Sequence, residues 1–177
     1  MIIKTKFKDL VIHINKPYRD KRGYLKELLR ENKIKKKFVV SILSFSKKNV
    51  LRGLHFQTKN PQGKYISVLR GKIFDVAVDI RKGSPTFLNY VAVELSPENG
   101  RQLVVPKGFA HGFQTLTDDC LVLYKVDQFY SKEDDQNIIW SDAEIAISWP
   151  IDNPILSAKD AAAPALAEAN INFEFMG

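Results

Sequence analysis

The feature that most constrains the fold is a series of short strand-like segments between residues 64 and 130. Apolar and β-branched residues fill these segments, and turn residues separate them about every ten residues. Gly71 interrupts KYISVLRGKIFDVAVDIR, and Asn99-Gly100 is a strong β-hairpin signal between VAVEL and QLVVP. Many short strands with regularly spaced turns predict an all-β sandwich or barrel.

One strand-like segment, residues 74–81, has an apolar face and an acidic face. The apolar face contains Phe74, Val76, Val78 and Ile80. The other face contains Asp75, Ala77 and Asp79. An acidic face either contacts solvent or lines the polar interior of a ligand-holding barrel, and alternation alone is compatible with both.

The segments that flank these strands differ in character. Residues 27–37 are polar and basic and predict one short helix, and residues 38–45 (FVVSILSF) predict a strand. Residues 157–170 are rich in alanine and predict one or two short helical turns, broken at Pro164. We expect one domain, residues 1–177, that is all-β with short N- and C-terminal helical segments.

The composition narrows the ligand and the compartment. The formal net charge is +7, with lysines concentrated at residues 33–37 and 47–48. This charge is compatible with a polyanionic ligand such as a phosphorylated metabolite, although lysines that are simply solvated are the more common explanation. The sequence has no nucleic-acid-binding motif and no long apolar run, so we expect neither nucleic acid nor membrane as a partner. The single cysteine, Cys120, favours a reducing compartment, the cytoplasm.

Histidines are the best candidates for chemistry. His13 lies in an apolar strand (VIHI), which predicts a structural role, whereas His55 and His111 lie beside glycines at expected strand ends. His55 is followed by Phe56-Gln57 rather than by a second metal ligand, and His111 has no neighbouring ligand. We therefore expect no metal and no cofactor, and acid–base chemistry remains.

Several side chains besides the histidines suit acid–base chemistry. They are Lys64, Tyr124, Tyr130 and Asp160. Asp160 has an alternative role, because Ser157 and Asp160 have the spacing of a helix capping box.

A set of motifs resembles one known family, the dTDP-4-dehydrorhamnose 3,5-epimerases. The motifs keep the order of the family from about residue 20 to residue 164, and they include LRGLHFQ (51–57), QGK (62–64), FDVAVDIR (74–81), VPKGFAHGF (105–113), LYK (123–125) and LSAKDAAAP (156–164). The resemblance implies a cupin-type jelly-roll barrel, a homodimer, and an isomerase that needs neither metal nor cofactor. The implied substrate is a nucleotide-activated 4-keto-6-deoxy-hexose, epimerised at C3 and C5.

The resemblance also implies roles for individual residues. The catalytic set consists of the base His55, its partner Asp160, the opposing acid Tyr124, and Lys64, which stabilises the enolate oxygen. The implied substrate- and nucleotide-binding residues are Arg22, Glu27, Arg52, Gln57, His111, Tyr130 and Lys159. Arg22 and Glu27 are expected to act across the dimer in many members, and Asp75 is expected to orient His111.

The chain departs from the family pattern just before LRGLHFQ. A Gln and an Asn of the family are replaced by Val40 and Ile42, whose side chains form no hydrogen bonds. A smaller departure is Leu25-Lys26, where aromatic residues are common. These changes keep two enzymatic alternatives open: a single-carbon epimerase or 3,4-ketoisomerase, and an enzyme for a GDP- or CDP-linked sugar. A third alternative, a non-catalytic sugar-binding cupin, does not depend on these changes, and the joint presence of the four implied catalytic residues argues against it. A metal-dependent cupin is a fourth alternative.

Overall fold

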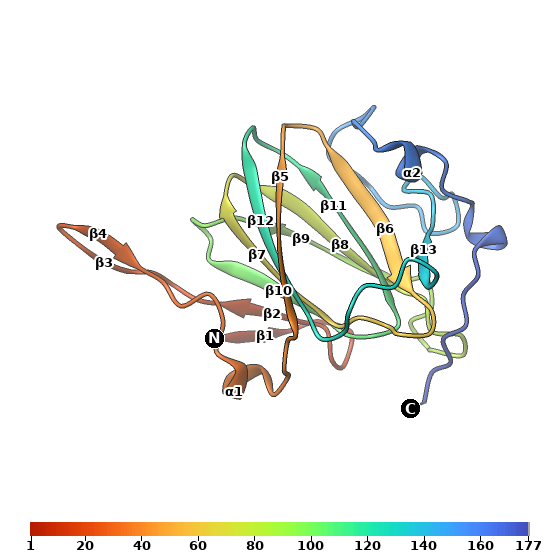
Figure 1. Cartoon of the computed structure of the whole chain (residues 1–177), viewed down its shortest axis with the longest axis horizontal. Helices are drawn as coiled ribbons and strands as arrows, with labels where there is room; N and C mark the ends of the chain where they lie inside the picture. Colours follow the sequence, from red (N-terminus) through yellow and green to blue (C-terminus); the bar gives the residue numbers. More distant parts are fainter. Residues whose placement is uncertain (177) are drawn as a thin grey trace.

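Two antiparallel β-sheets lie face to face and enclose a hydrophobic core (Figure 1). The structure is a computed structural model that describes residues 1–176, so Gly177, the last residue of the expected domain, lies outside the described residues. The first sheet contains β1 (Ile2–Lys4), β2 (Val11–Ile14), β5 (Val40–Ser46), β7 (Lys64–Arg70), β10 (Arg101–Val105) and β12 (Cys120–Val126). The second contains β6 (Leu51–Gln57), β8 (Ile73–Asp79), β9 (Tyr90–Leu95), β11 (Phe109–Thr115) and β13 (Asp135–Asn137).

The strand order determines which segments meet. The order is β1-β2-β10-β7-β12-β5 in the first sheet and β13-β6-β11-β8-β9 in the second. β5 is therefore an edge strand, whereas β7, β12, β6 and β11 are internal strands that carry most of the predicted site. Among residues 1–176, no helix is long and apolar enough to cross a membrane.

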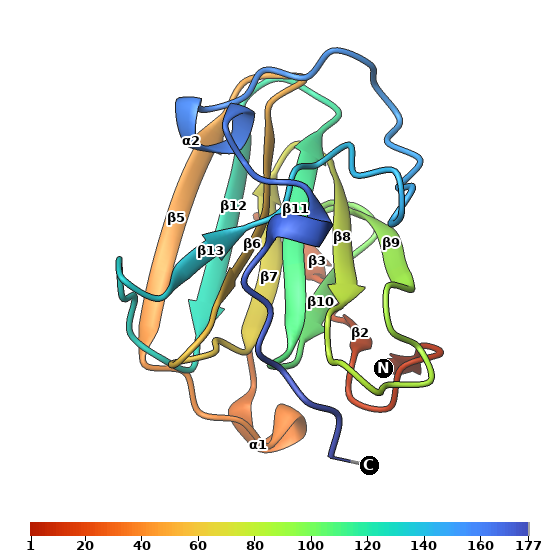
Figure 2. The ribbon, with the colours of Figure 1, turned by 90° about the vertical axis from the view of Figure 1, so that its right-hand side faces the viewer.

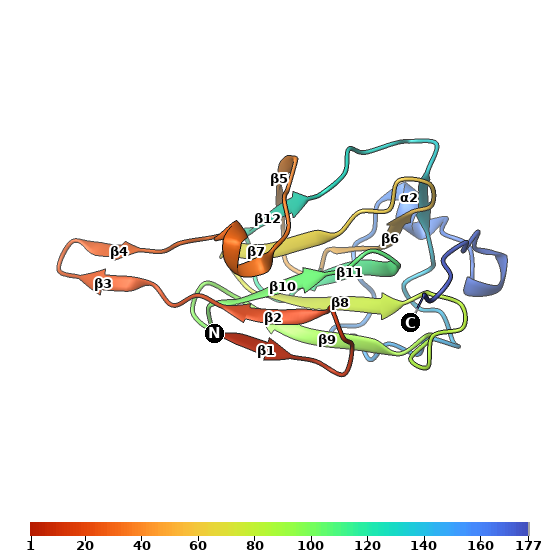
Figure 3. The same ribbon diagram turned by 90° about the horizontal axis from the view of Figure 1, so that it is seen from below.

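The remaining elements are short. β3 (Tyr18–Asp20) and β4 (Gly23–Leu25) form a hairpin that projects away from the sheets (Figure 3). The helix expected over residues 27–37 is only α1 (Glu31–Ile34), which ends where Lys35 adopts the left-handed conformation. The two C-terminal helical turns are present as α2 (Ala158–Ala161) and a 3₁₀ turn (Leu166–Glu168).

The prediction of a β-hairpin at Asn99-Gly100 is wrong. The chain does turn there, but β9 pairs with β8 in the second sheet, whereas β10 pairs with β2 and β7 in the first. The turn therefore connects the two sheets rather than two hydrogen-bonded neighbours. A turn signal is local, whereas strand pairing is decided by which apolar faces meet across the core.

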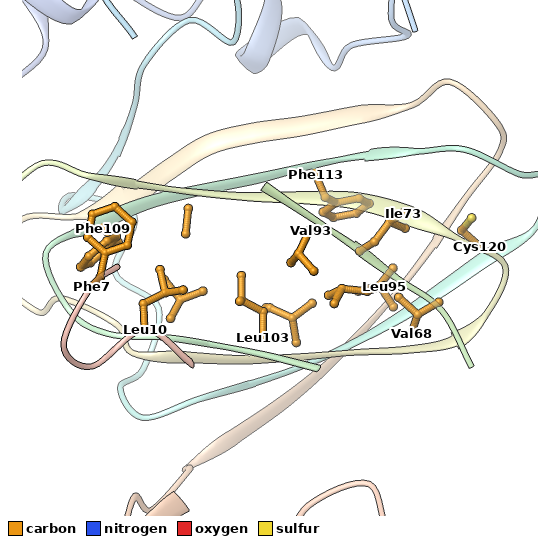
Figure 4. Packing of buried hydrophobic residues seen from close by; sticks show 14 residues of the cluster. Phe7, Leu10, Val68, Ile73, Val93, Leu95, Leu103, Phe109, Phe113 and Cys120 are labelled. Atoms are coloured by element: carbon orange, nitrogen blue, oxygen red, sulfur yellow. The ribbon is translucent and has the colours of Figure 1, made fainter. Parts of the chain in front are cut away.

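The main core lies between the sheets. Figure 4 shows Phe7 against Phe109 at one end of this core, with their rings edge to face and their centroids 5.2 Å apart. Ile73, Leu95 and Cys120 lie toward the other end. The C-terminal segment crosses the outer face of the second sheet (Figure 2), and a second apolar cluster joins the two.

The two apolar clusters explain the alternation in residues 74–81. The apolar face of this strand packs under the C-terminal segment, while Ala77 points into the main core. Asp75 and Asp79 are both 0% exposed. The acidic face is therefore interior rather than solvated, and this decides between the two possibilities that the sequence left open.

Candidate active site

A cavity of about 270 Å³ opens between the two sheets and collects most of the predicted catalytic residues. The first sheet contributes Lys64 from β7 and Tyr124 from β12, and the second contributes His55 from β6 and His111 from β11. The two imidazoles and the phenol therefore come from opposite walls. A second cavity of about 220 Å³ shares His55, Gln62 and Lys64 with the first.

Two glycines allow the histidine strands to approach closely. His55 and His111 are direct cross-strand partners, and they lie within β6 and β11 rather than at strand ends as expected. A Cβ on Gly53, whose φ is +131°, would come within 2.5 Å of the Gly112 Cα. Any side chain at Gly53 would push the two strands apart.

His55 pairs with Asp160 at the mouth of the cavity. The Nε2 atom of His55 lies 2.5 Å from Oδ1 of Asp160, and the second carboxylate oxygen accepts a hydrogen bond from Ser157 Oγ at 2.9 Å. Burial alone would raise the pKa of Asp160, but these hydrogen bonds lower it below its usual value. The backbone N–H of Asp160 also donates to the Ser157 hydroxyl, which is the N-cap of α2. Asp160 therefore contacts both His55 and the N-cap residue Ser157, and its role as the partner of a catalytic base stays a prediction.

Lys64 brings a cationic group between the two cavities. Its ammonium group lies 3.5 Å from the backbone oxygen of His55. Burial lowers the pKa of Lys64 to about 8, although Asp75 and Asp135 oppose the shift. Lys64 is therefore mostly charged at neutral pH but close to losing its proton.

Tyr124 and His111 line the first cavity from facing sheets. Their rings are edge to face with centroids 6.4 Å apart. Nε2 of His111 lies 3.0 Å from Oδ1 of Asp75, in the position expected for an orienting acid, while burial lowers the pKa of His111. Burial also raises the pKa of Tyr124, so the phenol is protonated when no base removes its proton.

Arg52 and Gln57 reach the site but are partly engaged with the protein itself. Arg52 lines the first cavity and donates to Ser46 Oγ at 3.1 Å and to the Phe45 backbone oxygen. Gln57 lines the second cavity, and its amide binds the backbone of the 129–131 loop. The structure gives Gln57 a clear contact with the loop that carries Tyr130, and its contact with a substrate stays a prediction.

One residue of the second cavity was missed by sequence reasoning. Asp135 accepts hydrogen bonds from the Tyr130 hydroxyl at 2.9 Å and from Lys159 Nζ at 2.5 Å. It therefore ties together two predicted binding residues that are far apart in sequence. No local signal marks Asp135, because β13 pairs with β6 only through tertiary structure.

Arg22 and Glu27 lie outside both cavities of their own chain. Arg22 is exposed in the β3–β4 hairpin and pairs with Asp20, while Glu27 pairs with Arg30.

His13 is buried and contacts the Tyr65 hydroxyl at 3.1 Å, in keeping with the expected structural role. Within residues 1–176, no three or more His, Cys, Asp or Glu side chains are grouped so that they could hold a metal.

Comparison with known proteins decides the family. A curated relative from Salmonella typhimurium, named dTDP-4-dehydrorhamnose 3,5-epimerase, is 49% identical over 177 residues, covering 96% of this chain and 97% of the relative. The family model described as dTDP-4-dehydrorhamnose 3,5-epimerase matches residues 4–168. The chain belongs to this family.

Solved structures extend the comparison of this dTDP-4-dehydrorhamnose 3,5-epimerase family member. A 3,5-epimerase from Legionella pneumophila, in complex with dTDP-4-keto-L-rhamnose, is 42% identical with a TM-score of 0.95, covering 100% of this chain and 99% of that chain. A 3′-monoepimerase from Streptomyces bikiniensis, in complex with dTDP-quinovose, is 28% identical with a TM-score of 0.86, covering 92% and 86%. The predicted cupin-type fold is confirmed.

One departure from the family pattern lies directly in the site. Ile42 lines the first cavity, is the cross-strand partner of Tyr124, and is 44% exposed. An isoleucine offers a ligand only apolar contact. In this member of the epimerase family, the β5 wall of the cavity is therefore less polar at residue 42 than it would be with the Asn of the family motif.

Proposed function

We propose that this protein is a dTDP-4-dehydrorhamnose 3,5-epimerase, which converts dTDP-4-dehydro-6-deoxyglucose into dTDP-4-dehydrorhamnose. The observation that carries the proposal is the convergence of His55, Lys64 and Tyr124 on one cavity from two facing sheets. An epimerase needs a base on one face of a carbon and an acid on the other, whereas a binding protein needs neither.

The proposed reaction uses the acidity of carbons beside a ketone. C3 and C5 both flank the C4 carbonyl, so each carries a proton that can be removed. His55 takes this proton, the C–H electron pair forms the enolate double bond, and the carbonyl pair moves onto the C4 oxygen. Tyr124 then gives its proton to the opposite face as the carbonyl forms again. The product is inverted at that carbon, and solvent restores neutral imidazole and phenol.

Lys64 and Asp160 are proposed to support these proton transfers. A preorganised cation beside the C4 oxygen stabilises the developing negative charge, which is often the largest catalytic contribution. Asp160, 2.5 Å from His55, would hold the ring and stabilise the imidazolium. The chemistry moves only protons, so we propose no metal and no cofactor.

The second cavity is proposed to hold the nucleotide. Tyr130 and Lys159 line this cavity and offer an aromatic face and a positive charge, and Arg52 adds positive charge for the diphosphate from the adjoining first cavity. The net charge of +7 favours the encounter with such an anion. We propose dTDP as the nucleotide, because the substrates of the relatives are dTDP-sugars.

We propose that the protein is a homodimer in which each β3–β4 hairpin reaches the partner's site. Tyr24 and Leu25 of the hairpin are exposed apolar side chains, and so are Leu43 and Phe45 on the edge strand β5. Exposed apolar residues on an arm and on a sheet edge favour burial against a second copy. This arrangement would give Arg22 and Glu27 a ligand that they lack in their own chain.

We further propose that residues 1–177 act as one domain in the cytoplasm. The single cysteine, Cys120, is buried and unpaired, as is usual in a reducing compartment.

The decisive experiment is incubation with dTDP-4-keto-6-deoxyglucose in heavy water, followed by NMR. We expect deuterium at both C3 and C5 and a product inverted at both carbons. Absence of exchange at both carbons would reject an enzymatic role on this substrate. The same assay with GDP- and CDP-linked sugars tests the choice of nucleotide.

A single-carbon epimerase is the second candidate, and Ile42 is the observation that favours it. Loss of a polar side chain beside Tyr124 could fix the sugar ring in one orientation. In the NMR assay, this alternative requires inversion at one carbon only. The variant Ile42→Asn would then gain inversion at the other carbon.

The dimer proposal is tested by mixing subunits. Arg22→Ala and His55→Ala chains should each be weakly active, but a hybrid dimer contains one site with both native residues. Activity should therefore return after the two variants are unfolded and refolded together. No recovery from a mixture whose hybrid dimers are verified by mass would place the hairpin in its own subunit.

A further inference from the structure

The Ser44 hydroxyl is an unusual group in the site. Its Oγ atom is buried, and it is the one buried side-chain nitrogen or oxygen in residues 1–176 without a hydrogen-bond partner. Ser44 lies on β5 and lines the same cavity as His55, Lys64 and Tyr124. An unpaired buried hydroxyl destabilises a fold, so its presence in a reactive cavity points to a use there.

The other two serines of β5 have hydrogen-bond partners, so their position on the strand does not account for the unpaired hydroxyl of Ser44. Ser46, two residues along β5, accepts a hydrogen bond from Arg52 at 3.1 Å, and Ser41 accepts one from Lys125. Alanine at position 44 would avoid the unpaired hydroxyl. Of these three serines, Ser44 is the one that lines the cavity with an unpaired hydroxyl, and this hydroxyl lowers the stability of the fold.

Strand register places Ser44 beside the proposed acid. Tyr124 on β12 is opposite Ile42, and Val122 is opposite Ser44, so Ser44 and Tyr124 are diagonal neighbours on the same face. Diagonal neighbours lie within reach of a long side chain such as tyrosine. Both residues line the cavity, and the Ser44 hydroxyl has no hydrogen-bond partner among the described residues.

We propose that Ser44 is a positioning residue for Tyr124 whose hydroxyl donates a hydrogen bond to the phenolate oxygen formed when Tyr124 protonates the sugar. This inference rests on the proposed function, because it needs Tyr124 to act as the acid. The O–H bond of Tyr124 breaks as the new C–H bond forms, and the negative charge left on the phenolate needs a donor inside the cavity.

The environment of Tyr124 makes this donor important. Burial raises the pKa of Tyr124, which means that the phenolate is poorly stabilised by its surroundings. The Ser44 hydroxyl, which is near enough to act on the phenol although the pair lies outside hydrogen-bond geometry, and the charge of Arg52 act in the other direction. Arg52 is already engaged with Ser46 and with the Phe45 backbone, whereas the Ser44 hydroxyl can rotate toward a new charge.

The test compares Ser44→Ala, Ser44→Thr and the control Ser41→Ala in heavy water. Deuterium exchange reports the base, whereas inversion needs the acid. We expect Ser44→Ala to keep wild-type exchange and KM, to slow inversion about 10- to 100-fold, and to melt at or above the wild-type temperature. Ser44→Thr, which restores a hydroxyl, should recover most of the inversion, and Ser41→Ala should behave as wild type.

The outcomes separate this inference from the proposed function. Wild-type inversion by Ser44→Ala would overturn the role of Ser44 and leave the epimerase intact. A parallel loss of exchange, inversion and thermal stability in Ser44→Ala would also overturn it, because it would indicate a structural role. Failure of the wild-type protein to exchange or invert would reject the proposed function itself.

Discussion

His55 Nε2 lies 2.5 Å from Asp160 Oδ1, although 105 positions separate the two residues in the chain. Ser157 holds the second oxygen of the carboxylate, so Asp160 is fixed on both sides. One ring nitrogen of His55 is thereby committed to Asp160, and the other is left to exchange a proton with a ligand. The pair has the geometry of a base with its orienting acid.

The pair predicts that His55→Ala and Asp160→Asn lose most activity. We expect His55→Ala to lose about 10²- to 10⁴-fold in turnover, since it removes the base. Asp160→Asn should lose less, because the imidazole remains but its cation is no longer stabilised. Deuterium exchange at C3 and C5 measures both effects. Asp152→Asn, an exposed control, should behave as wild type, and wild-type exchange by His55→Ala would disprove its role as the base.

Tyr124→Phe should separate exchange from inversion. His55 remains able to remove a proton and to return deuterium to the same face, so exchange should continue. Inversion should fall by about 10²-fold or more, because the opposite face has lost its donor. NMR of the product in heavy water measures both rates in one sample. Inversion at the wild-type rate would rule out Tyr124 as the acid.

Lys64 predicts how activity depends on pH. Its pKa is lowered to about 8, so the ammonium is present below this pH and lost as the pH rises through it. Because the charged form stabilises the enolate, kcat/KM should fall above about pH 8. A profile of kcat/KM between pH 6 and pH 10 measures this, with Lys64→Arg, whose cation keeps its proton up to pH 10, as the control that lacks this limb. An unchanged kcat/KM up to pH 10 would contradict the role of the ammonium.

The same lysine predicts a conflict between stability and activity. Below about pH 8 the folded chain carries a buried charge, and its stability should rise between pH 8 and the ordinary pKa of 10.5, where the folded state releases its proton first. Lys64→Met should therefore raise the free energy of unfolding at pH 7 by about 1–3 kcal/mol while it abolishes turnover. Denaturant titration measures the change, and a destabilised Lys64→Met would show that the lysine stabilises the fold.

Asp135 predicts an effect on binding rather than on proton transfer. Asp135→Asn keeps the size of the side chain but removes the charge that holds Lys159, and it weakens the contact with Tyr130. KM for the nucleotide sugar should rise several-fold, whereas kcat should change little. Steady-state kinetics measure both. An equal loss in kcat with unchanged KM would place Asp135 in the chemical step instead.

Sequence patterns predict the features of this fold that depend on neighbouring residues, and they miss those that depend on contacts between distant segments. Alternation and turn residues are local, so they predict the strands from β7 to β12 and the C-terminal helical turns. Pairing between distant segments has no local signal, which is why the Asn99-Gly100 turn was read as a hairpin. Asp135 was missed for the same reason, because its partner Lys159 reaches it only after α2 packs beside β6.

The resemblance to a known family predicted which distant residues share one site, which local sequence patterns do not predict. Motif positions, not periodicity, placed His55, Tyr124 and Asp160 in one site. The buried, unpaired hydroxyl of Ser44 was beyond both kinds of reasoning. It depends on which neighbours fail to reach the Oγ atom, and only atomic positions contain that information.

The position of Asp160 has a consequence for biosynthesis of the protein itself. Every strand of both sheets is complete in sequence at Asn137, but the partner of His55 comes later, in a segment fastened to the outside of the second sheet. During translation, the scaffold thus leaves the ribosome before its reactive pair can exist. A nascent or C-terminally clipped chain would have both sheets but a His55 without its carboxylate partner, so we expect the proposed base to gain its support only when the C-terminal segment docks.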